Sequence, residues 1–258
     1  MERLICLAGI CLILWSCGGN RSNGPSDTPT QGKIHIAADE AFAPIVAAEI
    51  NAFQGLYPKA TIVTHYVTEK EAFRLLMADS VRLVITGRDF SESEKAYFRD
   101  KKIKPTSLKI ASDAIGVVLH PENPDSLLRF SQLKNLLTGS TFSWKSLSGK
   151  GQDVKPVIVL DKEGSANEIS LLNNLGLSLS SIPHSIVRAG GDREVINYVN
   201  AHPEAIGFMG VNWISDQEDP LQMRFKSGIK VVALMPDSIE KLQESEPGLH
   251  DEEYFQPM

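Results

Sequence analysis

A strand, a glycine turn and a capped helix start follow one another in residues 157–172, VIVLDKEGSANEISLL. The β-branched run Val157–Val159 is typical of a buried strand, and Asp161–Gly164 is typical of a turn. Ser165 and Glu168 have the spacing of a capping box, which predicts a helix starting after Ser165. Backbone N–H groups and the positive end of a helix dipole would face outward there, so the segment suits an anion. A well-capped helix without a ligand is the simpler alternative.

Two other helix starts have the same character. Asp39 follows a short predicted strand, Lys33–Ala37, and can cap the helix after it, while Thr68 and Glu71 form a second capping box. In a parallel sheet wound with helices, such starts gather beyond the carboxyl ends of the strands, where ligands bind. We therefore expect the three helix starts, at Asp39, Thr68 and Ser165, to face one cleft.

Strands and helices alternate with short loops through the first half of the chain, which predicts an α/β fold. Two extended runs without helical periodicity, Ser107–His120 and Ala205–Val211, are predicted to cross between two lobes. We expect residues 33–110 to form lobe 1 and residues 111–207 to form lobe 2. Residues 208–258 are expected to return to lobe 1 and end in a tail.

The N-terminus has the features of an export signal. Leu4–Trp15 is an apolar run of about a dozen residues, too short for the roughly 20 that a membrane-spanning helix needs. Cys17 follows Leu-Trp-Ser, which resembles a bacterial lipobox. We therefore predict a signal peptide at residues 1–16, lipidation of Cys17, a flexible tether at residues 17–32, and location at the cell envelope. The alternative is an ordinary cleaved signal peptide, which would leave Cys17 as a free thiol.

Composition argues against several classes of function. The net charge is −6 and no basic run is present, which argues against nucleic acid as a partner. All three cysteines lie within the first 17 residues, so the body of the chain has neither a disulfide framework nor a cysteine metal site. There is no Gly-x-Ser-x-Gly, His-Glu-x-x-His or P-loop motif, and the six histidines lack ligand spacing. We expect a monomer without catalytic residues, metal or cofactor.

In this order the motifs resemble those of the substrate-binding proteins of phosphate importers, which have the type II periplasmic-binding-protein fold. The segments that carry the resemblance are ADEAFAP (38–44), YVTEKEAF (66–73), TGRDF (86–90), QLKNLLTGSTFSW (132–144) with Glu163–Ser165, and AIGFMGVNW (205–213). The resemblance implies two α/β lobes, each a mostly parallel sheet flanked by helices, joined by two crossover strands. It also implies that the lobes close on phosphate, or a similar oxyanion, and deliver it to an ABC transporter permease.

The resemblance further implies a set of ligand-binding positions. They are the backbone of Ala41 and Phe42, the hydroxyl of Thr68, Arg88 or Asp89, and the turn residues Gly164, Ser165 and Asn167. Arg88 is the one cation expected near the three helix starts. Asp89 could accept the proton of HPO4²⁻, which would exclude fully ionised sulfate.

The chain departs from the family at the turn before the third helix start. The family pattern R-x-x-G-S-G-T reads DKEGSAN at residues 161–167, with Asp161 in place of the arginine. A carboxylate facing a divalent anion would repel it. Either Asp161 points away and is bonded by nearby backbone N–H groups, which we favour, or it faces the cleft and phosphate is not the ligand. The departure also leaves open an envelope interaction or sensor protein that keeps the fold without transport, or with another ligand.

Overall fold

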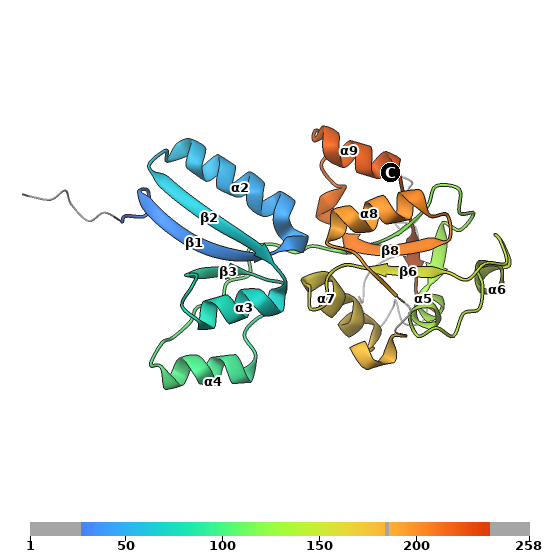
Figure 1. The fold of residues 1–258 in the computed structure, drawn as a ribbon, viewed down its shortest axis with the longest axis horizontal. Coiled ribbons are helices and arrows are strands. Elements are labelled where there is room, and N and C mark those ends of the chain that lie inside the picture. Colours follow the sequence, from blue (N-terminus) through green and yellow to red (C-terminus); the bar gives the residue numbers. More distant parts are fainter. Residues whose placement is uncertain (1–26, 184–185, 238–258) are drawn as a thin grey trace, which may run out of the picture.

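Two separate β-sheets, each flanked by helices, form two lobes that lie side by side along the molecule (Figure 1). The structure is a computed structural model, and it describes residues 27–183 and 186–237. The predicted signal peptide, Cys17 and most of the predicted tether and tail therefore lie outside the described residues. Within the described ranges, no helix is long and apolar enough to cross a membrane.

Lobe 1 is built on a three-stranded parallel sheet in the order β2-β1-β3. Its elements are β1 (Gly32–Asp39), η1 (Glu40–Phe42), α2 (Ala43–Leu56), β2 (Ala60–Val67), α3 (Glu69–Met77), β3 (Leu83–Ile85) and α4 (Glu92–Asp100). Helix α2 lies on one side of the sheet, and α3 and α4 lie on the other (Figure 1). The first half of β1 is partly exposed, whereas its last four residues, Ile36–Asp39, are buried. The carboxyl end of this central strand is therefore the end that is covered, and it lies next to lobe 2.

Lobe 2 contains a five-stranded mixed sheet in the order β7-β6-β8-β4-β9. Its strands are β4 (Ile115–Leu119), β6 (Val157–Leu160), β7 (Val187–Arg188), β8 (Ala205–Gly210) and β9 (Lys230–Val231), with β5 (Leu127–Arg129) and β10 (Ala233–Met235) paired separately. Its helices are α5 (Phe130–Leu137), α6 (Trp144–Ser148), α7 (Ala166–Leu175), η2 (Leu179–Ser181), α8 (Asp192–Ala201), η3 (Val211–Trp213) and α9 (Pro220–Ser227). Strands β6, β7 and β8 are parallel, and β4 runs antiparallel to β8.

Alternate residues of the central strands of lobe 2 enter two different cores. Ile158 and Leu160 pack on one face of the sheet with apolar residues of α5 and α7, whereas Val159 packs on the other with α8 and α9. This alternation is the period of two expected for a strand that is covered on both faces. The first turns of α7 and α8 are thereby fixed on opposite faces of one sheet, close to the ends of β6 and β7.

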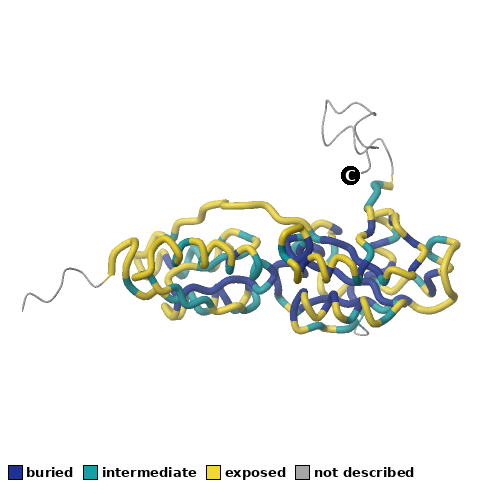
Figure 2. The backbone as a smooth tube through the Cα atoms, turned by 90° about the horizontal axis from the view of Figure 1, so that it is seen from above, coloured by how far each residue is buried: buried dark blue, intermediate teal, exposed yellow. Residues whose placement is uncertain are grey.

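The chain leaves lobe 1 through a long exposed connection (Figure 2). The predicted crossover strand Ser107–His120 forms only in part, because β4 begins at Ile115. Residues 107–114 are exposed and have no regular structure. A strand needs a neighbour for its hydrogen bonds, and β4 finds its neighbours, β8 and β9, only in lobe 2.

The prediction that residues 208–258 return to lobe 1 is wrong for the part that the structure describes. Strand β8 is buried at all six positions and lies in the middle of the second sheet, so it is a core strand rather than a connection. After it, β9 pairs with β4, and β10 pairs with β5. Only the short η3 turns towards lobe 1, where Asn212 and Trp213 donate to the carbonyl of Ala41 at 2.9 and 3.0 Å.

Candidate functional site

A small cavity lies where the two lobes meet. Its lining residues from lobe 1 are Asp39, Glu40, Ala41, Val67 and Thr68, and those from lobe 2 are Asp161, Lys162, Ser165, Gly191 and Asp192. They lie at the carboxyl ends of β1, β2 and β6 and at the starts of η1, α3, α7 and α8. The cavity volume is about 10 Å³, close to the room that one water molecule needs. A ligand larger than this requires the lobes to move apart.

Direct contacts hold the lobes together around this cavity. The carboxylate of Asp39 accepts from the N–H of Ala41 at 2.9 Å in its own lobe and from the N–H of Ala166 at 3.0 Å in the other. Glu40 forms an ion pair with Lys162 across the same boundary. Asp39 therefore occupies the N-terminus of α7, which is the helix end that favours negative charge.

Three buried aspartates border the cavity, at the ends of β1 and β6 and at the start of α8. Asp39, Asp161 and Asp192 expose 0%, 3% and 1% of their surface. Asp161 accepts from the hydroxyl of Ser165 at 2.6 Å and from the amide Nδ2 of Asn167 at 3.4 Å. The prediction that Asp161 points away from the cleft and bonds backbone N–H groups is wrong, because it lines the cavity and side chains hold it.

Asp192 is held through one of its two oxygens. Oδ1 accepts from the N–H of Gly210 at 3.0 Å and from Nδ2 of Asn167 at 2.8 Å. Oδ2 is buried and has no hydrogen-bond partner among the described residues. Nδ2 of Asn167 carries two hydrogens, so this amide can bridge Asp161 and Asp192. Asn167 thus contacts the two carboxylates and does not itself line the cavity.

The pKa values of the three aspartates are raised because these side chains are buried and none is paired with a cation in the part of the chain that the structure describes. Burial, helped by the charges of Asp39 and Glu168, raises the pKa of Asp161 to about 7, against the hydrogen bonds from Ser165 and Asn167. Burial and the charge of Asp161 raise the pKa of Asp192 well above its ordinary value. Burial also raises the pKa of Asp39, although the backbone N–H groups of Ala41, Ala166 and Glu69 oppose the effect. Asp161 can therefore bind a proton near neutral pH.

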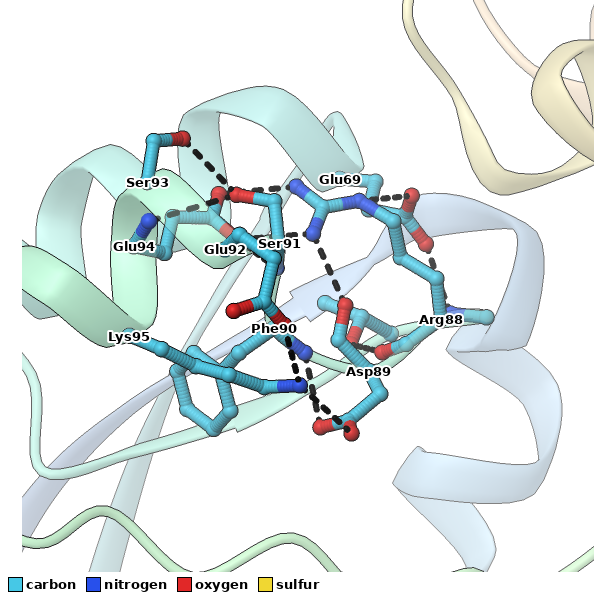
Figure 3. Close-up of polar contacts among 11 residues, drawn as sticks. Glu69, Arg88, Asp89, Phe90, Ser91, Glu92, Ser93, Glu94 and Lys95 are labelled. Atoms are coloured by element: carbon cyan, nitrogen blue, oxygen red, sulfur yellow. Dashed lines mark hydrogen bonds and ion pairs between the residues drawn. The ribbon is translucent and has the colours of Figure 1, made fainter.

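Arg88 is engaged elsewhere in lobe 1 (Figure 3). Its guanidinium pairs with Glu69 at 3.2 Å and Glu94 at 2.8 Å, donates to the carbonyl of Asp89 at 2.9 Å, and lies 3.9 Å from the centre of the Phe73 ring. The carboxylate of Asp89 accepts from the N–H of Phe90 at 2.7 Å. Among the residues that the structure describes, those lining the cavity include neither Arg88 nor Asp89. Lys162, which the sequence did not single out, is the cation that lines it.

The structure brings together Ala41, Thr68 and Ser165 from the predicted set, and all three line the cavity. The carbonyl of Gly164 accepts from the N–H of Lys70 at 3.5 Å, across the lobe boundary. The Cζ atom of the Phe42 ring lies 3.7 Å from the position that a Cβ atom on Gly87 would occupy. These two residues, like Asn167, lie beside the cavity rather than on its wall.

Both hydroxyls act as helix caps. Ser165 accepts from the N–H of Glu168 at 3.1 Å, and Thr68 accepts from the N–H of Glu71 at 3.4 Å. The return bond of a capping box is missing from both, since Glu168 accepts from the N–H of Gly164 instead and Glu71 binds Arg74. In α4, by contrast, the predicted capping box of Ser91 and Glu94 is complete. Each cavity hydroxyl therefore has one bond already committed to the backbone.

From the sequence, the helix start at Asp39 was expected to face the cleft, but Asp192 was not singled out. One signal was available, because Asp39 and Asp161 come at or just after the carboxyl end of a parallel strand, and Asp192 opens the helix that follows β7. Acidic clusters also raise the question of a metal. Within residues 27–183 and 186–237, no group of three or more His, Cys, Asp or Glu side chains could hold a metal ion.

Comparison with known proteins places this architecture in a family. The sequence profile of the PBP superfamily domain matches residues 23–255, and the chain belongs to this family. The type II periplasmic-binding-protein fold predicted from the sequence is confirmed. Within the family, the chain is PstS-like, as its motifs predicted.

Particular relatives give the extent of the likeness. The phosphate-binding protein PstS of Staphylococcus haemolyticus is 24% identical over 219 residues, 83% of this chain and 68% of the relative. Its counterpart in Staphylococcus epidermidis is 22% identical over 215 residues, 83% of this chain and 65% of the relative. The chain thus spans about two thirds of the length of these relatives. Among solved structures, a phosphate ABC transporter substrate-binding protein with bound phosphate from Clostridium perfringens has a TM-score of 0.68 at 21% identity, covering 79% of this chain and 76% of the other.

Proposed function

We propose that this protein is an extracytoplasmic lipoprotein that binds a small oxyanion, phosphate first, between its lobes and delivers it to an ABC importer. The family and the phosphate-binding relatives support this proposal. The observation that carries it is the contact between Asp39 and the N–H of Ala166. An oxygen with negative charge is already held at the start of α7, so the same N–H suits an oxygen of a ligand.

The binding event follows from the contacts around the cavity. When the lobes part, the N–H of Ala166 is released from Asp39, and the ion pair between Glu40 and Lys162 opens. An oxyanion entering the gap can accept from that N–H, from the hydroxyl of Thr68, and from the ammonium of Lys162. The lobes then close on the ligand instead of on each other. Enzymatic chemistry is not part of this proposal, because the relatives are named as binding proteins.

Calorimetry tests the proposal directly. The lipid-free chain starting after Cys17 is titrated with phosphate, sulfate and molybdate at pH 6 and pH 8. We expect one phosphate per chain, bound more tightly than either of the other anions. The absence of binding heat for all three anions at both pH values would contradict the proposal.

The anchor is tested separately, because residues 1–26 lie outside the described part. Cys17→Ala is expected to release the protein from the membrane fraction and remove its acyl groups, while thermal unfolding stays unchanged. Wild-type protein without acyl groups, found wholly in the soluble envelope fraction, would contradict lipidation.

An envelope interaction or sensor protein without transport is the second candidate. The observation that favours it is the same contact of Asp39, since the lobes meet through groups of the chain itself. Small-angle scattering separates the two functions. An importer component is expected to be open without phosphate and compact with it, and its deletion should reduce phosphate uptake. A protein that is equally compact in both conditions, with uptake unchanged by deletion, would favour the second candidate.

A further inference from the structure

We propose, on the basis of the proposed oxyanion function, that Asp161 and Asp192 take up protons when the anion binds, so that Asp192 and the Ser165 hydroxyl beside Asp161 donate hydrogen bonds to it. The ligand class of this cleft is then an oxyanion that enters together with protons, rather than a dianion held by Lys162 alone. At position 161 the turn pattern of the family has an arginine, whereas this chain has an aspartate.

The charges around the cavity are not balanced. Asp39, Asp161 and Asp192 face it without a cation of their own, from β1, β6 and the start of α8. Three other carboxylates nearby are paired, Glu40 with Lys162, Glu168 with Arg188, and Glu69 with Arg88, while Glu194 adds a further negative charge beside Gly191. A dianion brought into this site would meet uncompensated negative charge, which costs free energy where water is excluded. Protons are the simplest source of the missing positive charge.

The hydrogen bond between Ser165 and Asp161 would reverse its direction if Asp161 were protonated. The Ser165 hydroxyl has one hydrogen, and it is donated to Oδ1 of Asp161 at 2.6 Å. A proton from solvent on Oδ1 would reverse this bond, so that Asp161 donates to the Ser165 oxygen. That oxygen has two acceptor positions and can keep the N–H of Glu168 as well. The hydroxyl hydrogen of Ser165 then becomes available to the ligand.

The second carboxyl oxygen of Asp192 offers another position for a proton. Oδ2 is buried and lacks a hydrogen-bond partner among the described residues, and Asp192 lines the cavity. A proton on Oδ2 would turn it into a donor to an anion, while Oδ1 keeps its bonds from Gly210 and Asn167. Because the Asn167 amide occupies Oδ2 of Asp161 and Oδ1 of Asp192, it leaves the other oxygen of each carboxyl for the proton. Burial raises the pKa of both residues, to about 7 for Asp161, and this direction favours proton uptake.

Calorimetry of phosphate binding in two buffers of different ionisation enthalpy measures the protons taken up. The wild type is compared with Asp161→Asn between pH 5 and pH 8. The amide imitates the protonated acid, since its NH2 can donate to Ser165 and its oxygen can accept from Asn167. Phosphate has the same titration in both experiments, so any difference between the proteins belongs to position 161. Asp79→Asn is the matched control, because Asp79 is exposed and lies beyond the far end of α3.

We expect the wild type to take up more protons than Asp161→Asn, by up to one proton at pH 8. The variant should bind phosphate about tenfold more tightly than the wild type at pH 8, because it avoids protonating a group of pKa about 7, and equally well at pH 5. The control should match the wild type.

Equal proton counts and equal affinities at pH 8 would overturn this inference and leave the proposed function standing. Failure of phosphate to bind to either protein at any pH would overturn both. If the variant does not fold, as judged by circular dichroism, the proton count of the wild type still decides. A count no larger than the protons that phosphate itself takes up would overturn the inference.

Discussion

Glu94 and Asp161 lie in neighbouring regions of this protein, and their pKa values are shifted in opposite directions. Around Arg88, Glu69 and Glu94 share one guanidinium, and the hydrogen bond from Arg88 lowers the pKa of Glu94 to about 2 (Figure 3). Around the cavity, Asp161 has only a hydroxyl and an amide as donors, and burial raises its pKa to about 7. Burial alone favours the neutral acid, so the identity of the donor decides which form persists. The ion pair of Arg88 and Glu94 is thus charged near neutral pH, whereas Asp161 can change protonation there. Glu69, which is more deeply buried, has its pKa raised by burial despite Arg88.

The largest effect expected from this contrast is on the pH dependence of stability. Asp161 binds a proton more tightly in the folded state, so its contribution is complete below pH 3.8 and is lost as pH rises towards 7. Relative to Asp161→Asn, the wild type should lose up to about 4 kcal/mol of unfolding free energy over this window, at about 1.36 kcal/mol per pH unit. Urea unfolding of both proteins from pH 4 to pH 8 measures the difference.

Glu94→Gln is the opposite control. The pKa of Glu94 is lowered by folding, so its contribution is complete above pH 4.5 and is lost as pH falls towards 2. The stability difference between this variant and the wild type should therefore change at acid pH and remain constant from pH 5 to pH 8. A constant difference between wild type and Asp161→Asn from pH 4 to pH 8 would show that the contrast is wrong.

Removal of Arg88 is the next largest test. Arg88→Ala leaves Glu69, whose side chain is 1% exposed, without its cation. Breaking a buried pair in this way should cost about 3 kcal/mol, the low end for such pairs because Arg88 itself is 33% exposed. Urea unfolding measures the cost, and calorimetry should find phosphate affinity within about threefold of the wild type. A large loss of affinity with unchanged stability would return Arg88 to the binding site.

The fold was predictable because its signals are local and repeated. The alternation of strand and helix, and Asp39, Thr68 and Ser165 as caps, were read from residue spacing, and the structure contains them. The error concerned β8, AIGFMG, whose apolar run fits either a crossover or a central strand until its neighbours are known. The residues of a strand do not show with which distant strand it pairs.

The site was less predictable, because its charges are paired in three dimensions. Arg88 follows a strand end and was therefore expected in the cleft. The guanidinium of Arg88 instead donates to Glu94, six residues later in the chain. Asp161 was expected to find backbone donors, but its partners are the side chains of Ser165 and Asn167. Whether a charged side chain faces a cavity depends on such competing partners, and spacing alone does not reveal them.

The smallest expected effect distinguishes the two capping hydroxyls that line the cavity. Ser165 caps α7 at 3.1 Å and also donates to Asp161, whereas Thr68 caps α3 at 3.4 Å. Thr68→Ala should cost about 0.5–1 kcal/mol, equally at pH 5 and pH 8, as for the loss of a weak cap. Ser165→Ala should cost about 1–2 kcal/mol at pH 5 and more at pH 8. The added cost arises because the charged form of Asp161 loses its hydroxyl donor, which raises the pKa of this carboxyl further. Urea unfolding of both variants at the two pH values measures it, and an equal cost of Ser165→Ala at pH 5 and pH 8 would mean that the hydroxyl acts as a cap alone.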